Sequence, residues 1–338
     1  MSPAPGRSAA SPFRVGLTRD LLTPAGQPSF GAGPLALLDD DPRIEWEYLP
    51  EAVSEITPDI MSRYDGLYVN SPAVPAAAAG RDDCRVRIVA RHGVGFDSVD
   101  VAALAARGII TTNTPIAIRR PVAVAALTMV FALAGRLFEK DRLTRANRWH
   151  ERTAFMGQGL TTRTLGIIGV GGIGRELLGL ARPFGWRMLA ADPYVEPAVA
   201  KDLGAELVSL ERLLGEADFV VATVLLNPAT RHLMNAERFA LMKPSAFFVN
   251  LSRGPIADEK ALVAALQNRV IAGAGIDVFE QEPVAADNPL LTMDNVIVTP
   301  HALCWTDECF DHIAREGLSC IVDFANGRRP RSVVEPAG

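Results

Sequence analysis

The sequence predicts an α/β protein built from two doubly wound units, each a parallel sheet covered by helices on both faces. Short apolar runs alternate with helical segments along the 338 residues, an order typical of parallel sheets. A glycine-rich turn near the middle of the chain joins one apolar run to a helix. The length, as a prior, allows about two domains.

The composition is that of a globular protein, with 49% hydrophobic and 22% charged residues. The net charge is −5 and no Lys/Arg-rich block occurs, so we expect no nucleic-acid partner. The four cysteines form no CxxC pair and no regular framework, which favours a reducing cytoplasm without disulfides or a metal site.

No segment suggests export or a membrane. The N-terminal residues 1–13 are small and polar, so we expect a disordered tail and no signal peptide. The longest apolar stretch, 121–135, is shorter than the roughly 20 residues that span a bilayer. We therefore expect a cytoplasmic protein without membrane contact.

The first unit alternates strands and helices up to Thr114-Pro115. The expected strands are FRVGL (13–17), EWEYL (45–49), GLYV (66–69), RIVA (87–90) and IITTN (109–113). Helices are expected over 34–39, 56–64 and 99–107, after a Gly/Pro-rich loop at 22–34.

A helix is predicted from Pro121 to Leu137, with proline at its first position. It is apolar almost all round, so every side must be covered. We expect it to pack on its own domain and on a second subunit. Burial within one large monomer is the alternative.

The second unit is organised around residues 164–193. An apolar strand at 164–168 leads into Gly169-x-Gly171-x-x-Gly174, then a helix, then a strand at 188–191. Gly169 allows a sharp turn, Gly171 lets a pyrophosphate approach the backbone, and Gly174 lets helix and strand pack closely. The helix N-terminus, which includes Gly172 and Ile173, favours phosphate.

Asp192 follows the second strand, where an acceptor for the ribose 2′-hydroxyl belongs. A carboxylate there repels a 2′-phosphate, so we predict NAD as the cofactor. A glycine turn inside a buried core is the alternative.

Further βα units follow this turn. Strands are expected over 218–223, 246–251, 271–277 and 295–298, with a helix at 258–266. A last long helix at 306–326 can return to the first unit.

Three polar residues follow strand ends: Arg253, Glu282 and His301. The carboxyl ends of parallel strands are where ligands collect. Arginine binds a carboxylate, histidine moves a proton near neutral pH, and an acid orients the imidazole. The alternatives are an exposed ion pair, a solvated loop acid and a structural histidine. We assign the other histidines to structure or surface: His92, His150, His232 and His312.

The sequence resembles the D-isomer-specific 2-hydroxyacid dehydrogenases. The matching segments are RHGVGFDSVD (91–100), TNTP (112–115), TLGIIGVGGIG (164–174), ADPY (191–194), RHLMNAERFALMKPSAFFVNLSRGPIADEKALVAAL (231–266), GIDVFEQEP (275–283) and TPH (299–301).

The resemblance implies a flavodoxin-like substrate-binding domain, residues 1–116 and 303–338, and a Rossmann NAD-binding domain, residues 117–302, with the active site in the cleft between them. It implies an enzyme that interconverts a 2-oxo acid and a D-2-hydroxy acid. We expect a homodimer through the NAD-binding domain.

The resemblance also implies residue roles. Arg253 would hold the substrate's carboxylate and carbonyl oxygen. His301 would be the acid/base, and Glu282 would pair with it and raise its pKa.

Further roles follow for the ligand-binding loops. The backbone N–H groups of Val94 and Gly95 would bind the carboxylate, and Asp277 would hydrogen-bond the nicotinamide carboxamide.

After the TNTP segment the family often has Gly and then an Ala-Glu pair, where this sequence has Ile116 and Ala123-Val124. Arg119 and Arg120 lie between them, just before Pro121. The dipole of a helix opposes a cation at its N-terminus, which hints at a functional demand. We hypothesise that one arginine binds a second negative group on the substrate. The alternative is that both are solvated or pair across a dimer interface. Trp305 could line the substrate pocket.

A second departure is Leu225-Leu226-Asn227, where the family usually has Pro-Leu-Thr, beside the expected adenine and ribose.

An alternative function is an NAD(H)-sensing protein of the co-repressor type, with little turnover. Formate dehydrogenases share the fold but typically carry glutamine where Glu282 stands.

Overall fold

A computed structural model describes residues 11–336. Residues 1–10 of the expected N-terminal tail lie outside the described part. The chain divides into two compact units, each described by itself: unit 1 is Met1–Ile118 with Thr306–Gly338, and unit 2 is Arg119–Trp305.

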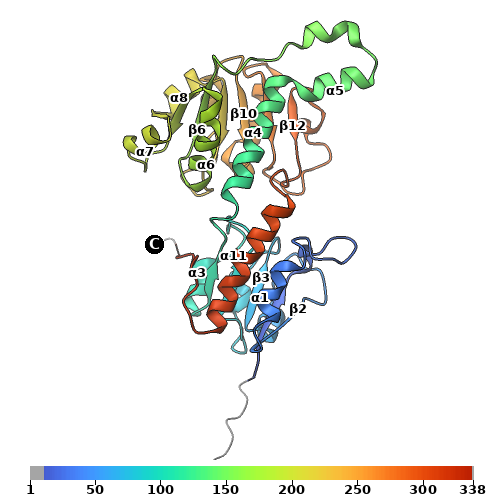
Figure 1. The fold of residues 1–338 in the computed structure, drawn as a ribbon, viewed down its shortest axis with the longest axis vertical. Coiled ribbons are helices and arrows are strands. Elements are labelled where there is room, and N and C mark those ends of the chain that lie inside the picture. The colour runs from blue at the N-terminus through green and yellow to red at the C-terminus, as the bar shows by residue number, and fades with distance from the viewer. Residues whose placement is uncertain (1–10, 337–338) are drawn as a thin grey trace, which may run out of the picture. The chain divides into compact units, whose positions relative to one another are not determined.

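Unit 1 contains a parallel sheet of five strands in the order β2-β1-β3-β4-β5 (Figure 1). The strands are β1 (Phe13–Leu17), β2 (Ile44–Tyr48), β3 (Gly66–Val69), β4 (Ile88–Arg91) and β5 (Ile110–Thr112). The α-helices are α1 (Ala36–Asp39), α2 (Pro58–Arg63), α3 (Val101–Ala106) and α11 (Asp307–Ala325).

The core of unit 1 lies on both faces of this sheet. Alternate residues of β3 divide between them: Leu67 and Val69 pack with α2 and α3, whereas Tyr68 packs with α1 and α11. Helix α11 belongs to this unit although it is last in the chain, and it contacts β3, β4 and α1. The Thr306 hydroxyl caps it by accepting from the Cys309 N–H.

Unit 2 contains a parallel sheet of seven strands in the order β12-β11-β10-β9-β6-β7-β8. The strands are β6 (Thr164–Ile168), β7 (Arg187–Ala191), β8 (Glu206–Leu207), β9 (Phe219–Ala222), β10 (Phe247–Asn250), β11 (Gly273–Ile276) and β12 (Val296–Val298). The α-helices are α4 (Arg119–Gly135), α5 (Leu137–Arg145), α6 (Gly172–Ala181), α7 (Pro197–Asp202), α8 (Leu210–Glu216), α9 (Ala236–Ala240) and α10 (Glu259–Gln267).

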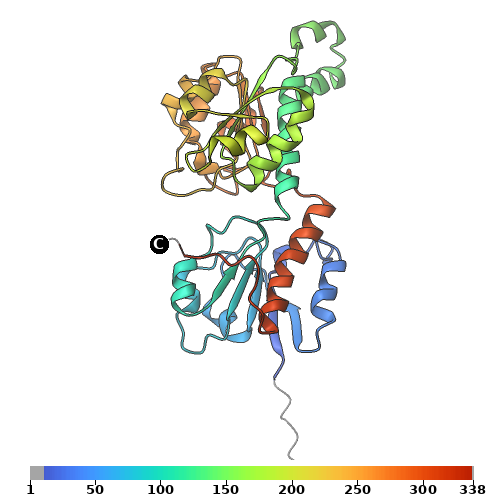
Figure 2. The same cartoon turned by 60° about the vertical axis from the view of Figure 1, so that its left-hand side comes forward.

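These two sheets confirm the predicted doubly wound α/β class. In unit 2, helices α8, α9 and α10 supply one buried layer. Helix α4 contacts β10, β11 and α6. Their alternation along the chain, visible in Figure 2, is what the strand and helix patterns predict.

The bounds predicted for the long apolar helix, Pro121–Leu137, were wrong by two residues at each end. Helix α4 begins at Arg119, because proline is tolerated throughout the first turn of a helix and not only at its first position. It ends at Gly135, since Arg136 adopts a left-handed conformation with φ 50° and ψ 47°.

The segment that follows α4 has no element predicted from the sequence. Helix α5 and a 3-10 stretch at Trp149–Phe155 form an arm that extends away from the sheet of unit 2 in both views (Figures 1 and 2). Among the described residues, no single helix is long and apolar enough to cross a membrane. The pair α4 and α5, bent by 57°, meets those criteria only when taken together.

His92, after β4, is a buried structural histidine, as expected from the sequence. Its Nδ1 lies 2.6 Å from the Tyr68 hydroxyl, and its ring contacts Phe30 and Phe310. Burial, assisted by the neighbouring charge of Arg91, lowers the pKa of His92 to about 3. The imidazole is therefore neutral in the folded protein at neutral pH.

This burial predicts acid sensitivity. Between pH 6.5 and about 3 the unfolded chain binds a proton at His92 that the folded chain does not, so stability falls as pH falls. The slope from this group approaches about 1.4 kcal/mol per pH unit. Urea unfolding from pH 7 to pH 5 should show a shallower dependence in His92→Phe than in the wild type. Equal slopes would contradict the account.

Candidate active site

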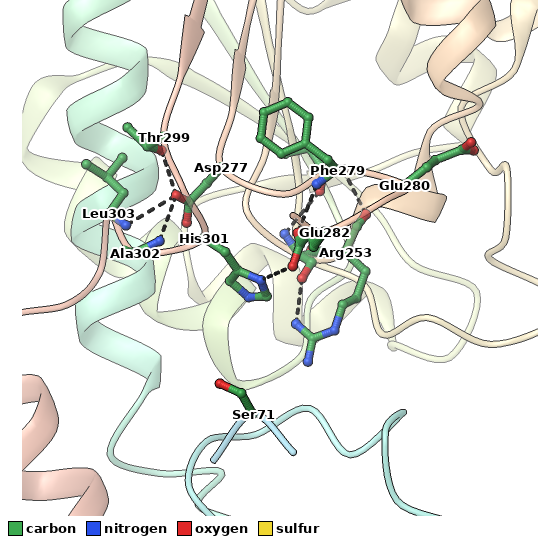
Figure 3. A network of polar contacts seen from close by, with 12 residues as sticks. Ser71, Arg253, Asp277, Phe279, Glu280, Glu282, Thr299, His301, Ala302 and Leu303 are labelled. Carbon is green, nitrogen blue, oxygen red and sulfur yellow. Dashed lines mark hydrogen bonds and ion pairs between the residues drawn. The ribbon is translucent and has the colours of Figure 1, made fainter. Parts of the chain in front are cut away.

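The strand ends of unit 2 bring three predicted catalytic residues to one edge of the sheet. Strands β10, β11 and β12 are neighbours, and Arg253, Glu282 and His301 lie on the loops that follow them. Figure 3 shows the three side chains in one network. The sheet order explains how residues 48 positions apart come together.

His301 and Glu282 form the pair predicted from the sequence. The imidazole Nδ1 lies 2.7 Å from Oε2 of Glu282, and each side chain is about 40% exposed (41% and 39%). The other carboxylate oxygen accepts from the Phe279 N–H at 2.9 Å. Since a carboxylate only accepts, Nδ1 carries the proton and Nε2 is the nitrogen that can exchange a proton with a ligand.

Opposing effects act on the Glu282 carboxyl. Partial burial raises its pKa, but the hydrogen bonds from His301 and the Phe279 N–H, with the charge of Arg253, outweigh burial and hold the pKa below its ordinary value. Glu282 is therefore ionised at neutral pH and can stabilise a protonated His301.

Asp277 holds the loop that carries His301. Its side chain is 2% exposed, and Oδ1 accepts from the Thr299 hydroxyl at 2.6 Å and from the N–H groups of Ala302 and Leu303 at 3.1 and 3.2 Å (Figure 3). Its carbonyl accepts from the His301 N–H at 2.7 Å. His301 itself has φ 55°, a conformation that costs free energy in a non-glycine residue. Asp277 thus maintains the strained backbone at His301, the residue predicted from the sequence to transfer a proton.

The loop of Arg253 is fixed by contacts with its neighbours. Asn250 donates from Nδ2 to the Arg253 carbonyl at 2.9 Å, and Arg253 donates from Nη1 to the Ser252 carbonyl at 2.8 Å. A Cβ on Gly254 would lie 1.9 Å from the Phe279 carbonyl carbon. This close approach couples the Arg253 loop to the Glu282 loop.

The glycine turn has the geometry that its expected role requires. Gly169 has φ 94°, which makes the sharp turn after β6. A Cβ on Gly171 would meet no atom within 4 Å, whereas one on Gly174 would lie 2.1 Å from the Gly169 carbonyl oxygen. The backbone is thus open at Gly171 and tightly packed at Gly174.

The residues around this turn fit NAD. The N–H groups of Gly172 and Ile173 begin α6 and donate to no acceptor among the described residues. Asp192, after β7, accepts from the N–H groups of Val170 and Tyr194 at 2.8 Å each, so it also supports the turn. A carboxylate can accept further bonds, which leaves capacity for a ribose hydroxyl.

The loop after β4 in unit 1 also has donors available. Within the part of the chain that the structure describes, the N–H groups of Val94 and Gly95 donate to no protein acceptor. The Asn113 amide holds the Val94 carbonyl at 2.7 Å, and the Thr114 hydroxyl accepts from the Gly93 N–H at 2.9 Å. These bonds fix a backbone segment that can bind an anion.

Arg119, Arg120 and Trp305, the further candidates for contact with the substrate, lie at the two ends of the sequence range of unit 2. Arg120 forms an ion pair with Glu176 of α6 at 2.8 Å. Arg119 lies against Gly172, the first residue of α6. Trp305 is about half exposed (53%), and its N–H donates to the Ala302 carbonyl at 2.9 Å.

The remaining expectations concern histidines and metals. His232 lies 2.6 Å from Glu280, and His150 lies 3.6 Å from Glu151. Across residues 11–336, no group of three or more His, Cys, Asp or Glu side chains is arranged to hold a metal ion.

Residue-level analysis of the sequence missed Asn250, Gly254 and Thr299 as members of this network. Asn250 ends β10 and could have been found as a polar residue at the same sheet edge as Arg253. Gly254 and Thr299 carry no comparable signal, because their roles depend on contacts with Phe279 and Asp277.

A strand, a glycine turn with open N–H groups, and an Arg/Glu/His set at the strand ends fit an NAD-dependent oxidoreductase. The family model described as "D-isomer specific 2-hydroxyacid dehydrogenase, NAD binding domain" matches residues 127–302. The chain belongs to the D-isomer specific 2-hydroxyacid dehydrogenase family, as the sequence resemblance predicted, and is an NAD-dependent enzyme of this family.

Two curated relatives illustrate the family. A glyoxylate reductase of Korarchaeum cryptofilum is 40% identical over 253 residues, covering 74% of this chain and 76% of that protein. A D-3-phosphoglycerate dehydrogenase of Synechocystis is 36% identical over 280 residues, covering 83% of this chain and 50% of that protein.

Solved structures show the same fold. A protein from Thermus thermophilus has a TM-score of 0.83 at 30% identity, with 95% of this chain and all of that chain covered. A D-lactate dehydrogenase of Aquifex aeolicus, solved with NAD and lactic acid, has a TM-score of 0.82 at 25% identity, covering 96% of this chain and all of that chain.

The role of Asp277 as a positioning residue predicts the effect of Thr299→Val. Removing one hydrogen bond to a buried carboxylate should destabilise the protein by about 1–3 kcal/mol. It should also lower kcat, because the His301 backbone is less firmly held. Urea unfolding and steady-state kinetics check both, with Thr292→Val, which removes an exposed hydroxyl, as the control. A variant unchanged in stability and kcat would refute the role.

Proposed function

We propose that the enzyme catalyses the reversible, NAD-dependent reduction of a 2-oxo acid to a D-2-hydroxy acid, with His301 as acid/base and Arg253 as the group that holds the substrate carboxylate. The single observation that carries this assignment is the His301–Glu282 pair, at 2.7 Å, beside Arg253 at neighbouring strand ends.

Bound NADH would supply the hydride that goes to C2 of the substrate. His301 would donate the proton on Nε2 to the carbonyl oxygen, and the carbonyl becomes a hydroxyl. The Glu282 carboxylate stabilises the imidazolium before transfer and keeps the ring oriented afterwards. In the oxidation direction Nε2 takes the proton back.

Arg253 would bind the substrate carboxylate through its planar guanidinium and polarise the carbonyl oxygen. Val94 and Gly95 are further proposed substrate-binding residues, since their N–H groups have no protein acceptor among the described residues. Trp305 remains a candidate for contact with the substrate side chain.

The cofactor would be held by the glycine turn and two acids. Gly169, Gly171, Gly172, Ile173 and Gly174 form the pyrophosphate-binding turn in this proposal. Asp192 would accept from the ribose. Asp277 would accept from the carboxamide through Oδ2, because its three side-chain bonds to the His301 loop all use Oδ1.

The domain roles follow from these assignments. Residues 117–302 would be the NAD-binding domain, and residues 1–116 with 303–338 the substrate-binding domain. We propose the reducing cytoplasm as the place where the enzyme works, because the four cysteines of the sequence form no CxxC pair and no regular framework. Since relatives that cover three quarters of the chain are named glyoxylate reductases, glyoxylate is the first substrate to test.

Replacement of Arg253 tests the function. Arg253→Ala should lower kcat/KM for a 2-oxo acid about a hundred- to a thousandfold, because a charge-stabilising donor is lost. Arg253→Lys should be intermediate, since it keeps the charge but not the planar pair of donors. NADH affinity, measured by fluorescence titration, should stay within about twofold in both. Full activity in Arg253→Ala would exclude the proposed role.

We further propose a homodimer through the NAD-binding domain. Val124, Thr128 and Gly135 of α4 are exposed and Phe131 is half-buried, at spacings that place them on one face of the helix. The arm adds large exposed apolar side chains: Leu137, Phe138, Trp149 and Met156. Apolar surface of this extent is typical of an interface with a second copy.

Light scattering on the purified protein should give about twice the chain mass of 36.2 kDa. Val124→Asp with Thr128→Arg should shift the protein to a monomer, because both side chains are exposed in the monomer and charges would be buried in the interface. Leu241→Asp, an exposed apolar residue beside α9, is the control and should leave the mass unchanged. A monomeric wild type, or a dimeric double variant, would contradict the proposal.

A further inference from the structure

Arg119 takes the space that a side chain at position 172 would occupy. A Cβ built on Gly172 would lie 2.5 Å from Nε of Arg119 and 3.1 Å from its Cζ. Gly172 is the first residue of α6, and Arg119 is the first residue of α4. Because position 172 is glycine, the side chain of Arg119 can lie at the N-terminus of α6, the helix that follows the glycine turn.

We propose that Arg119 is a cofactor-binding residue, whose guanidinium neutralises the pyrophosphate of NAD, and that Gly172 is glycine to make room for it. The inference rests on the proposed function, in which the glycine turn holds this pyrophosphate. It replaces the idea that Arg119 binds a second anion on the substrate.

Electrostatics supports a bound anion here. Arg119 stands at the positive end of α4 and beside the positive end of α6, and each helix dipole opposes a cation by up to about 1 kcal/mol. A dianionic pyrophosphate next to Arg119 would reverse the unfavourable interaction with both helices.

The neighbouring backbone is arranged for the same ligand. Gly171 has open space around its Cα, and the N–H groups of Gly172 and Ile173 have no acceptor among the described residues. A phosphate on these donors would lie at the residue that Arg119 contacts. Arginine is suited to this role, because its fork of N–H groups matches the oxygens of a phosphate.

Binding of cofactor fragments tests the proposal without turnover. Calorimetry with NADH, ADP-ribose and adenosine separates the pyrophosphate from the base. In Arg119→Gln the affinity for NADH and ADP-ribose should fall at least tenfold, while adenosine affinity stays within twofold. The salt dependence of ADP-ribose binding should also become shallower, because one fewer cation faces the phosphates.

Two further variants make the test specific. Gly172→Ala adds a Cβ where Arg119 lies, so it should reproduce the loss for ADP-ribose, and combining it with Arg119→Gln should add little. Gly179→Ala, on the same helix with nothing within 4 Å, is the glycine control and should bind like the wild type. Arg120→Gln with Glu176→Gln removes the ion pair without changing net charge, and should also bind like the wild type.

The results distinguish the proposed role of Arg119 from the proposed binding of NAD by the glycine turn. If the wild type binds NADH and ADP-ribose but Arg119→Gln binds both equally well, the assignment of Arg119 is wrong and the glycine turn stands. A raised KM for the 2-oxo acid with unchanged NADH affinity would assign Arg119 to the substrate instead. If the wild type binds neither dinucleotide nor ADP-ribose, both proposals fall.

Discussion

The hydrogen bonds of the buried Asp277 determine the geometry of the loop that carries His301. One oxygen accepts three hydrogen bonds from residues 299, 302 and 303, and the carbonyl accepts the N–H of His301. A polar side chain at 2% exposure is stable only when it is hydrogen-bonded, and these bonds in turn hold His301 in a left-handed conformation. The bonds of Asp277 thereby hold the strained backbone of His301 and help to fix the orientation of its imidazole.

The other residues of the site are connected to the His301 loop through direct contacts. Glu282 accepts the hydrogen bond from Nδ1 of His301, so Nε2 is the nitrogen that remains for proton exchange. Gly254 packs against the Phe279 peptide, and the Phe279 N–H donates to Glu282. The arginine that would bind the carboxylate and the histidine that would move the proton are therefore held by one continuous set of backbone contacts.

Much of the fold was predictable because its signals are local. The alternation of apolar runs and helical segments predicted both parallel sheets. The dinucleotide-binding turn was predicted from the spacing of three glycines and an acid, Gly169, Gly171, Gly174 and Asp192. Arg253, Glu282 and His301 were predictable as a group, because residues at the ends of neighbouring parallel strands converge.

Other features depend on contacts that the sequence does not encode locally. The bounds of α4 were missed because Arg119 and Arg120 are unfavourable at a helix start, and the ion pair that compensates Arg120 comes from Glu176, more than fifty positions away. Asp277 was predicted as a ligand for the carboxamide, yet its hold on the His301 loop depends on Thr299 and two backbone N–H groups. The arm after α4 was not predicted from the sequence, and it carries the large exposed apolar side chains of Leu137, Phe138, Trp149 and Met156.

Isotope transfer tests the central claim most directly. The purified enzyme would be given a 2-oxo acid with NADH deuterated at C4, using the 4R and 4S forms in separate reactions. The account predicts that one of the two forms delivers deuterium to C2 of the product, and that chiral products have the D configuration. A product without deuterium from either form, or tight NADH binding with no reduction of any 2-oxo acid, would contradict hydride transfer as the function of this site.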